Sequence, residues 1–133
     1  MRVSGSNPDG QPWRLAIGDR TLERKVKEVL ALFGGAVATS GDKRNYFEFE
    51  GARYSHNLDP RSGYPINHGL ASVTVLSDTC AEADAWATSL MVMNPEYALD
   101  IINKMDGIEI LLLTSKNNEI FEIKSNSWDL VTQ

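Results

Sequence analysis

A buried strand followed directly by a capped helix constrains the fold of this chain more than any other feature. Residues 70–76 read Leu-Ala-Ser-Val-Thr-Val-Leu, which is typical of a strand with little solvent contact. Thr79 comes next, with Glu82 three residues later, and this capping-box pattern predicts the first turn of a helix. The helix is expected to run to about Met93 and to stop at the Asn-Pro pair of residues 94–95.

The rest of the chain predicts mostly short strands. Residues 3–12 are rich in turn formers and are expected to be a loop. Residues 25–39 predict two strands with a turn at Gly34-Gly35, and a short helix at 22–32 is the alternative. Further strands are expected at 13–17, 46–50, 53–56, 108–114 and 119–124, and a second helix at about 96–105. Several antiparallel strands with two adjacent helices predict an α+β fold.

The bulk properties predict one domain over residues 1–133 and exclude few functions. The chain carries a formal net charge of −5 with scattered basic residues, which argues against a nucleic-acid partner. Its apolar runs are shorter than the ~20 residues that a membrane helix needs. The single cysteine has no partner for an internal disulfide. Trp13, Phe33 and Trp128 are assigned to core or terminal packing.

Residues 54–63 place a histidine, an aspartate and an arginine within six positions. His56 is a candidate general base. Asp59 is suited to orienting His56 or to accepting hydrogen bonds from the backbone amides of the loop. Arg61 can bind a phosphate or Asp59. Each residue also has an ordinary interpretation: a strand histidine bonded to a carbonyl, a turn-initiating Asp-Pro, and a solvated arginine. His68 is expected to be a loop residue without a functional role.

Two further clusters carry polar side chains that suit phosphate and metal chemistry. Thr39, Ser40 and Gly41 follow an apolar strand, and we expect a turn whose hydroxyls and free amides can bind phosphate; an ordinary turn is the alternative. Asp84 and Thr88 lie at i and i+4, so their side chains share one helix face. They offer Mg²⁺ two hard oxygen ligands, whereas a polar stripe on a solvated face is the alternative. Together the clusters suggest a phosphate-handling site that uses a metal.

The order of these motifs resembles the FAD:protein FMN transferases, the ApbE family. The similarity extends from about Val3 to Leu113. It is carried by Ala38-Thr39-Ser40-Gly41-Asp42, His56-Asn57-Leu58-Asp59-Pro60-Arg61-Ser62-Gly63 and Ala83-Asp84-Ala85-Trp86-Ala87-Thr88, with support from Gly10-Gln11-Pro12-Trp13-Arg14-Leu15-Ala16-Ile17. Family members are longer, and the chain matches their C-terminal half. The resemblance implies a T-fold-like C-terminal portion whose N-terminal half is absent.

The resemblance also implies an activity. The family splits the FAD diphosphate with the help of Mg²⁺, places FMN on a threonine or serine hydroxyl of an acceptor flavoprotein and releases AMP. A periplasmic, membrane-tethered location is typical of the family. The matching positions imply that His56 is the base, that Asp84 and Thr88 are metal ligands, and that Thr39, Ser40, Gly41, Asp59 and Arg61 lie in the flavin site.

Two positions depart from the family pattern, and other functions stay open. Asn57 stands where the family usually has an apolar residue, and Ser62 stands where it has threonine. Because half of the flavin pocket is absent, activity of this chain alone is not implied. One alternative is a non-catalytic flavin-binding or partner-docking module. Another is a structural domain that pairs with a separate N-terminal subunit or self-associates through the face that the missing half leaves open.

Overall fold

The structure is a computed structural model that describes residues 1–18, 26–41, 46–49, 52–55, 57–66, 68–116 and 119–132, with the backbone alone at 46–49, 52–53 and 55. The strands are β1 (Arg2–Ser4), β2 (Trp13–Gly18), β3 (Val26–Leu32), β4 (Gly34–Gly41), β5 (Tyr46–Phe49), β6 (Ala52–Ser55), β7 (Leu70–Ser77), β8 (Glu109–Lys116) and β9 (Glu119–Lys124). The helices are α1 (Cys80–Val92), α2 (Pro95–Ile102) and α3 (Trp128–Val131).

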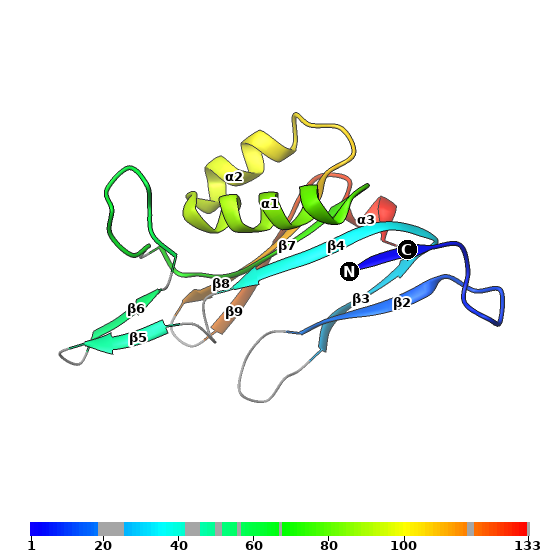
Figure 1. The fold of residues 1–133 in the computed structure, drawn as a ribbon, viewed down its shortest axis with the longest axis horizontal. Coiled ribbons are helices and arrows are strands. Elements are labelled where there is room, and N and C mark those ends of the chain that lie inside the picture. The colour runs from blue at the N-terminus through cyan, green and yellow to red at the C-terminus, as the bar shows by residue number, and fades with distance from the viewer. Residues whose placement is uncertain are drawn as a thin grey trace.

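A five-stranded sheet in the order β1-β4-β7-β8-β9 forms the centre of the molecule, and every neighbouring pair is antiparallel. Helices α1 and α2 cover one face of this sheet, and the β2–β3 ribbon lies against the other (Figure 1). Both faces are therefore covered, which explains why every residue of β7 is buried. The β5–β6 hairpin extends from one end of the sheet (Figure 1).

Small side chains bring α1 close to the sheet. Ala83 and Ala87 are fully buried, and they belong to the same cluster as Val73 and Val75 of β7. Leu90 continues this buried stripe one turn further along the helix. The buried alanines face the sheet, while other residues of α1 stay exposed and form a polar surface.

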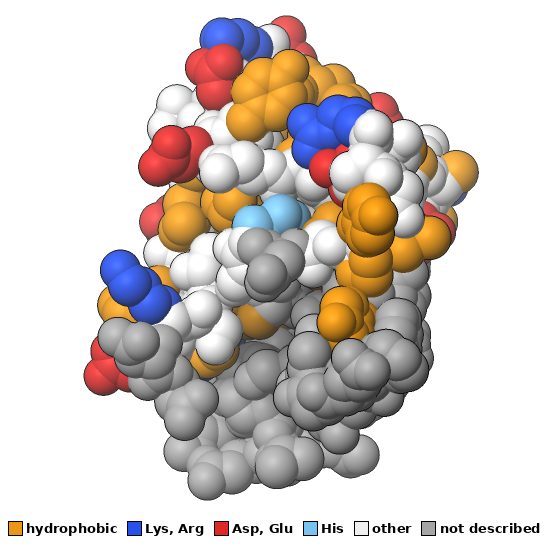
Figure 2. Space-filling view, turned by 90° about the vertical axis from the view of Figure 1, so that its left-hand side faces the viewer, with side chains coloured by type: hydrophobic (Ala, Val, Ile, Leu, Met, Phe, Trp, Pro, Cys, Tyr) orange, Lys and Arg blue, Asp and Glu red, His pale blue; other side chains and the backbone are white. Residues whose placement is uncertain are grey.

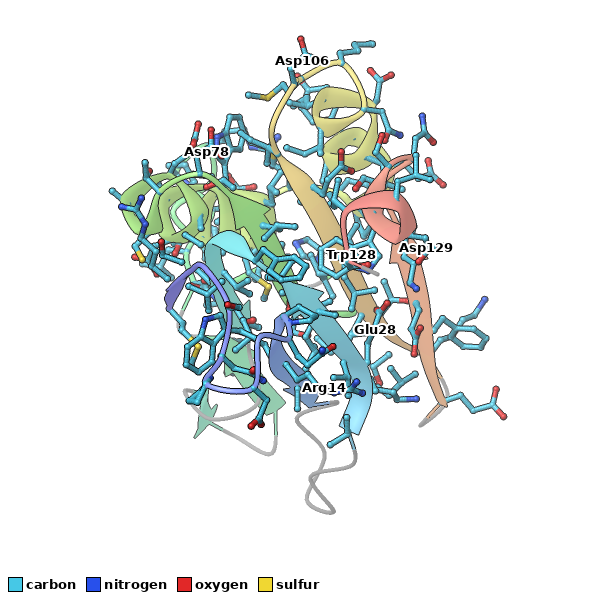
Figure 3. The ribbon with its side chains drawn as sticks, turned by 90° about the vertical axis from the view of Figure 1, so that its right-hand side faces the viewer. Arg14, Glu28, Asp78, Asp106, Trp128 and Asp129 are labelled. Carbon is cyan, nitrogen blue, oxygen red and sulfur yellow. The ribbon has the colours of Figure 1, made fainter. Side chains whose placement is uncertain are left out.

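Hydrophobic packing and one carboxylate hold the β2–β3 ribbon in place. Leu30 and Trp128 are fully buried in a second cluster on this face of the sheet. Glu28 of β3 accepts a hydrogen bond from the Trp128 indole N–H at 3.1 Å and from Lys124 Nζ at 3.0 Å (Figure 3). Hydrogen bonds to Asp129 and to Glu28 raise the pKa of Lys124 above its usual value. The ribbon is thus tied to both β9 and α3.

The α+β class and most predicted elements are confirmed. β3 rules out the helix that was the alternative for its residues, because residues 26–32 pair with β2 in an antiparallel register. The N-cap is as predicted, since the Thr79 hydroxyl accepts a hydrogen bond from the Glu82 amide at 3.2 Å. The helix ends with Met93 as its C-cap, and Pro95 opens α2.

Several details of the fold differ from the sequence-based expectations. Val3 and Ser4 belong to β1, although residues 3–12 were expected to be a loop, because they pair with the start of β4. The short helix α3 was not expected, and α2 ends at Ile102 rather than near residue 105. Trp13 and Phe33 are 38% and 60% exposed, so of the three residues assigned to core or terminal packing only Trp128 lies in the core. Among the described residues, no helix is long and apolar enough to span a membrane.

Candidate functional site

The pair Thr39 and Ser40 lies inside β4, which corrects the prediction of a turn. The strand continues to the buried Gly41, because residues 36–41 pair with β7 without interruption. Neighbouring side chains of a strand point to opposite faces of the sheet. The Ser40 hydroxyl accordingly lies 3.2 Å from the Thr88 hydroxyl of α1, whereas Thr39 does not share that surface.

The Thr39 hydroxyl instead lies 2.9 Å from the hydroxyl of Thr74 on β7, which is fully buried. Thr39 also lines a hollow of about 280 Å³ between the sheet and the ribbon, together with Ile17 and Val37. The two hydroxyls that follow the apolar part of β4 are thus separated by the sheet. Only Ser40 joins the polar surface of α1.

Asp84 and Thr88 form the other part of that surface. They lie one turn apart on α1, and both are exposed, while Ala83 and Ala87 face the core. Within the described part of the chain, Asp84 takes part in no hydrogen bond or ion pair. The described residues contain no group of three His, Cys, Asp or Glu side chains that could hold a metal. One carboxylate and two hydroxyls nevertheless suit Mg²⁺, which binds few protein oxygens and completes its shell with water and phosphate.

The segment of residues 57–66 forms a loop that is closed on itself. The Ile66 amide donates to the Asn57 carbonyl at 3.0 Å, and the Asp59 amide donates to the Tyr64 carbonyl at 2.9 Å. Gly63 has a φ of +73° and donates its amide to the Asp59 carbonyl at 2.7 Å. This conformation favours glycine, so the loop has a defined shape set by its backbone.

Asp59 and Arg61 form a bidentate ion pair within this loop. Arg61 donates from Nε to Oδ1 at 2.9 Å and from Nη2 to Oδ2 at 2.7 Å, and its backbone amide also reaches Oδ1 at 2.9 Å. These bonds lower the pKa of Asp59 to about 2, with the Arg61 side chain as the largest cause. They raise the pKa of Arg61. Both groups are therefore charged near neutral pH.

The loop lies beyond the ends of α1 and α2 (Figure 1), and the Tyr97 side chain of α2 is near enough to influence the pKa of Arg61. The described hydrogen bonds and ion pairs connect Ser40 with Thr88 and Asp59 with Arg61, and none of them joins the two pairs. His56, the predicted base, lies outside the described residues, directly before the loop. Its role as the base therefore stays a prediction.

His68 lies in a loop, as expected, and the fold places it beside the β8–β9 hairpin. It lines an open hollow of about 480 Å³ at the end of β8 and β9, together with Gly69, Thr114, Ser115, Lys116 and Phe121. Neither ring nitrogen is exposed to solvent, and neither has a hydrogen-bond partner among the residues that the structure describes. Figure 2 draws the side of the molecule on which histidine surface, in pale blue, is visible. Only the fold brings the ring to this position, because its local sequence is that of an ordinary loop.

Comparisons with known proteins identify the class of protein. The model of the ApbE family matches residues 1–112, so the chain belongs to the ApbE family. It is 44% identical over 119 residues to the FAD:protein FMN transferase of Escherichia coli (strain K12), covering 89% of this chain and 34% of the relative. It is 43% identical over 129 residues to that of Vibrio cholerae, covering 96% of this chain and 38% of the relative.

Solved structures agree with this assignment. The Vibrio cholerae flavin transferase ApbE matches with a TM-score of 0.81 and 37% identity, over 98% of this chain and 41% of that one. The apo form of Pseudomonas stutzeri flavinyl transferase ApbE matches with a TM-score of 0.78 and 39% identity, over 97% and 39% of the two chains. This chain spans about a third of the length of the curated relatives that it matches, 34% for the Escherichia coli protein and 38% for the Vibrio cholerae protein.

Proposed function

We propose that this chain is part of a flavin transferase that moves FMN from FAD to a threonine or serine hydroxyl of an acceptor flavoprotein and releases AMP. The observation that carries the proposal is the membership in the ApbE family over residues 1–112. The geometry supports it, because Ser40, Asp84 and Thr88 provide a polar surface on α1 and β4. Arg61, which is exposed, lies in the loop beyond the ends of α1 and α2.

Asp84 and Thr88 are the residues that we expect to hold Mg²⁺. When bound, the metal would neutralise negative charge on the flavin diphosphate as the AMP group leaves. The Ser40 hydroxyl, 3.2 Å from that of Thr88, restricts the rotation of the threonine side chain. Two ligands on one helix turn leave room for water and phosphate oxygens, which is the coordination that Mg²⁺ prefers.

His56 is the residue that we expect to act as general base. A threonine hydroxyl is a weak nucleophile, and removal of its proton during attack on phosphorus typically contributes about 10²–10⁴-fold in rate. His56 directly precedes the closed loop of residues 57–66.

Arg61 is suited to hold a phosphate. Its guanidinium has five N–H donors, and Asp59 engages the edge formed by Nε and Nη2. Among the residues that the structure describes, the remaining donors have no partner, and the side chain is 75% exposed. Asp59 therefore orients the arginine without using up its capacity for a second anion.

The test is to mix the full natural protein with FAD and Mg²⁺ and a candidate acceptor, and to measure AMP release together with acceptor flavin fluorescence. We expect both signals from the unaltered protein and neither from His56→Ala. Thr88→Val is expected to lower turnover, and Ser89→Ala is its matched control, because Ser89 is the exposed neighbour whose hydroxyl donates to the Ala85 carbonyl. Turnover that survives His56→Ala would exclude this residue as the base.

A non-catalytic flavin-binding or partner-docking module gives a different result in the same experiment. It predicts FAD binding without AMP release, and no effect of His56→Ala on that binding. The observation behind this second candidate is length, since the chain covers only 34% of the Escherichia coli relative. Repeating the measurement on this chain and on the full natural protein distinguishes two explanations. Either the protein lacks the activity, or this chain is inactive because it covers only part of the enzyme.

We also propose a periplasmic, membrane-tethered location for the full natural protein, on the basis of the family resemblance. Fractionation of cells that make the full natural protein is the test. We expect the protein in the membrane fraction and accessible to a protease added to spheroplasts. Recovery from the cytoplasmic fraction would contradict this location.

A further inference from the structure

The edge of β4 that faces β1 is paired over only part of its length (Figure 1). β1 pairs with residues 34–36, and Met1 adds one more pair. The Val37 amide donates to the Met1 carbonyl, and the Met1 amino group donates to the Val37 carbonyl, both at 2.7 Å. Among the described strands, β1 is the only neighbour of β4 on this side. Because β4 continues to Gly41, residues 38–41 form an open edge in the described part of the chain.

The pairing with Met1 fixes which backbone groups point to this open edge. In an antiparallel ladder, alternate residues of a strand direct their N–H and C=O groups to the same side. The groups of Val37 point to the β1 side, since they bond Met1. Those of Thr39 and Gly41 therefore point to the open edge, whereas those of Ser40 point to β7. Such an edge is a place where a further strand can pair.

A hollow of about 280 Å³ lies along the same edge. Met1, Val37 and Thr39 line it from the central sheet, and residues 15–18 of β2 line it from the ribbon. A strand paired with β4 would lie about 4.7–4.9 Å from it. Space beside β4 and backbone groups that can pair with a strand thus occur at the same place.

The segment that directly precedes Met1 in the full natural protein is the occupant that the register favours. Along β1, each step toward Met1 moves the pairing one residue further along β4, and at Met1 it reaches Val37. In the same register, the four residues before Met1 would pair with residues 38–41. This pairing closes no new loop, because the segment continues a strand that is already in place, so its entropic cost is small.

We propose that in the full natural protein the four residues that precede Met1 continue β1 along residues 38–41 of β4. The inference rests on the proposed function, which takes this chain as part of a longer flavin transferase; the chain covers 34% of the Escherichia coli relative. Residues opposite each other in an antiparallel pair lie on the same face of the sheet. The third residue before Met1 thus lies beside Ser40 on the α1 face, where the Ser40 hydroxyl meets Thr88. The segment therefore completes the sheet and borders the proposed metal site.

Hydrogen exchange of the full natural protein, measured amide by amide with NMR, tests the pairing without FAD. The amides of Ala38 and Ser40 face β7 and are the internal control. If the strand continues, the amides of Thr39 and Gly41 should exchange within about tenfold of these two, because both sides of β4 are then paired. Exchange that is more than tenfold faster at Thr39 and Gly41 overturns the proposal.

Disulfide formation tests which segment is paired and in what register. The position directly before Met1 falls opposite Ala38 as a non-hydrogen-bonded pair, with Cα atoms about 4.5 Å apart, which a disulfide can join. In the full natural protein, with Cys80→Ser and any other natural cysteines replaced, a cysteine placed there should join Ala38→Cys on oxidation. The matched control places that cysteine one residue further from Met1, where it faces the other side of the sheet and should form no disulfide.

The remaining outcomes separate this strand from other occupants of the edge and from the proposed function. Protection of Thr39 and Gly41 that appears only with the acceptor, or that grows with protein concentration, overturns the proposal, because an acceptor strand or a second copy then occupies the edge. A disulfide in the control variant and none in the first pair overturns the register. Neither measurement needs FAD, so AMP release without the strand overturns this inference alone, and the strand without AMP release overturns the proposed activity alone.

Discussion

Two neighbouring residues of β4 lie on opposite faces of the central sheet, and the two faces give them different surroundings. Ser40 points to the α1 face, where its hydroxyl meets Thr88 on a surface open to solvent. Thr39 points to the ribbon face, where its hydroxyl pairs with the buried Thr74. The same two hydroxyls, one residue apart, thus serve a candidate site on one face and a largely buried interface on the other.

This difference separates stability from chemistry within one small fold. On the ribbon face, apolar packing around Leu30 and Trp128 and the hydrogen bonds to Glu28 hold the ribbon against the sheet. On the α1 face, the polar side chains directly follow the buried alanines in the helix sequence and lie beside them on the same turns. Substitutions on the two faces should therefore change different measured quantities.

The largest effect is expected on the ribbon face. Leu30→Ala removes a fully buried side chain and leaves a cavity, which typically costs about 2–5 kcal/mol of unfolding free energy. Val29→Ala is the matched control, because Val29 is the preceding residue of β3 and is 40% exposed. Its cost should stay below about 1 kcal/mol. Urea unfolding measures both, and equal losses would contradict the packing of this face.

On the α1 face the effect should appear in turnover instead. Asp84→Asn in the full natural protein is expected to lower Mg²⁺-dependent AMP release by at least about 100-fold, because it removes the only carboxylate of the proposed metal site. The free energy of unfolding should change by no more than about 0.5 kcal/mol, since Asp84 is exposed. Titration of activity against Mg²⁺ is the measurement. An unchanged Mg²⁺ dependence would remove Asp84 from the metal site.

The comparison becomes sharpest at the adjacent residues of β4. Ser40→Ala should lower turnover by about tenfold and leave stability nearly unchanged, because its hydroxyl positions an exposed partner. Thr39→Val should do the reverse, with a loss of about 1 kcal/mol and little change in turnover, because it removes a hydrogen bond to a buried hydroxyl. The same pattern in both variants would show that the sheet does not separate the two roles.

The sequence predicted what depends on local periodicity and failed where tertiary pairing decides. The spacing of Asp84 and Thr88 places them on one helix face, and the Thr79 cap marks where that helix starts. Thr39 and Ser40 have the composition of a turn, but pairing with β7 keeps them in a strand. The surroundings of His68 come from β8 and β9, more than forty residues away, and no local pattern signals them.

The smallest expected effect concerns the loop of residues 57–66, whose ion pair forms within the loop itself and involves neither face of the sheet. Arg61→Gln should raise the pKa of Asp59 from about 2 toward its ordinary 3.8, because the arginine is the main cause of the lowered value. With the lowered pKa, the ion pair contributes to stability above about pH 3.8, and the contribution is lost as the pH falls through about 2. NMR titration of the Asp59 carboxyl carbon measures this shift. Arg14→Gln, an exposed arginine on β2, is the control and should leave the midpoint in place. A midpoint that stays near 2 in Arg61→Gln would mean that the loop amides, rather than the guanidinium, hold the carboxylate.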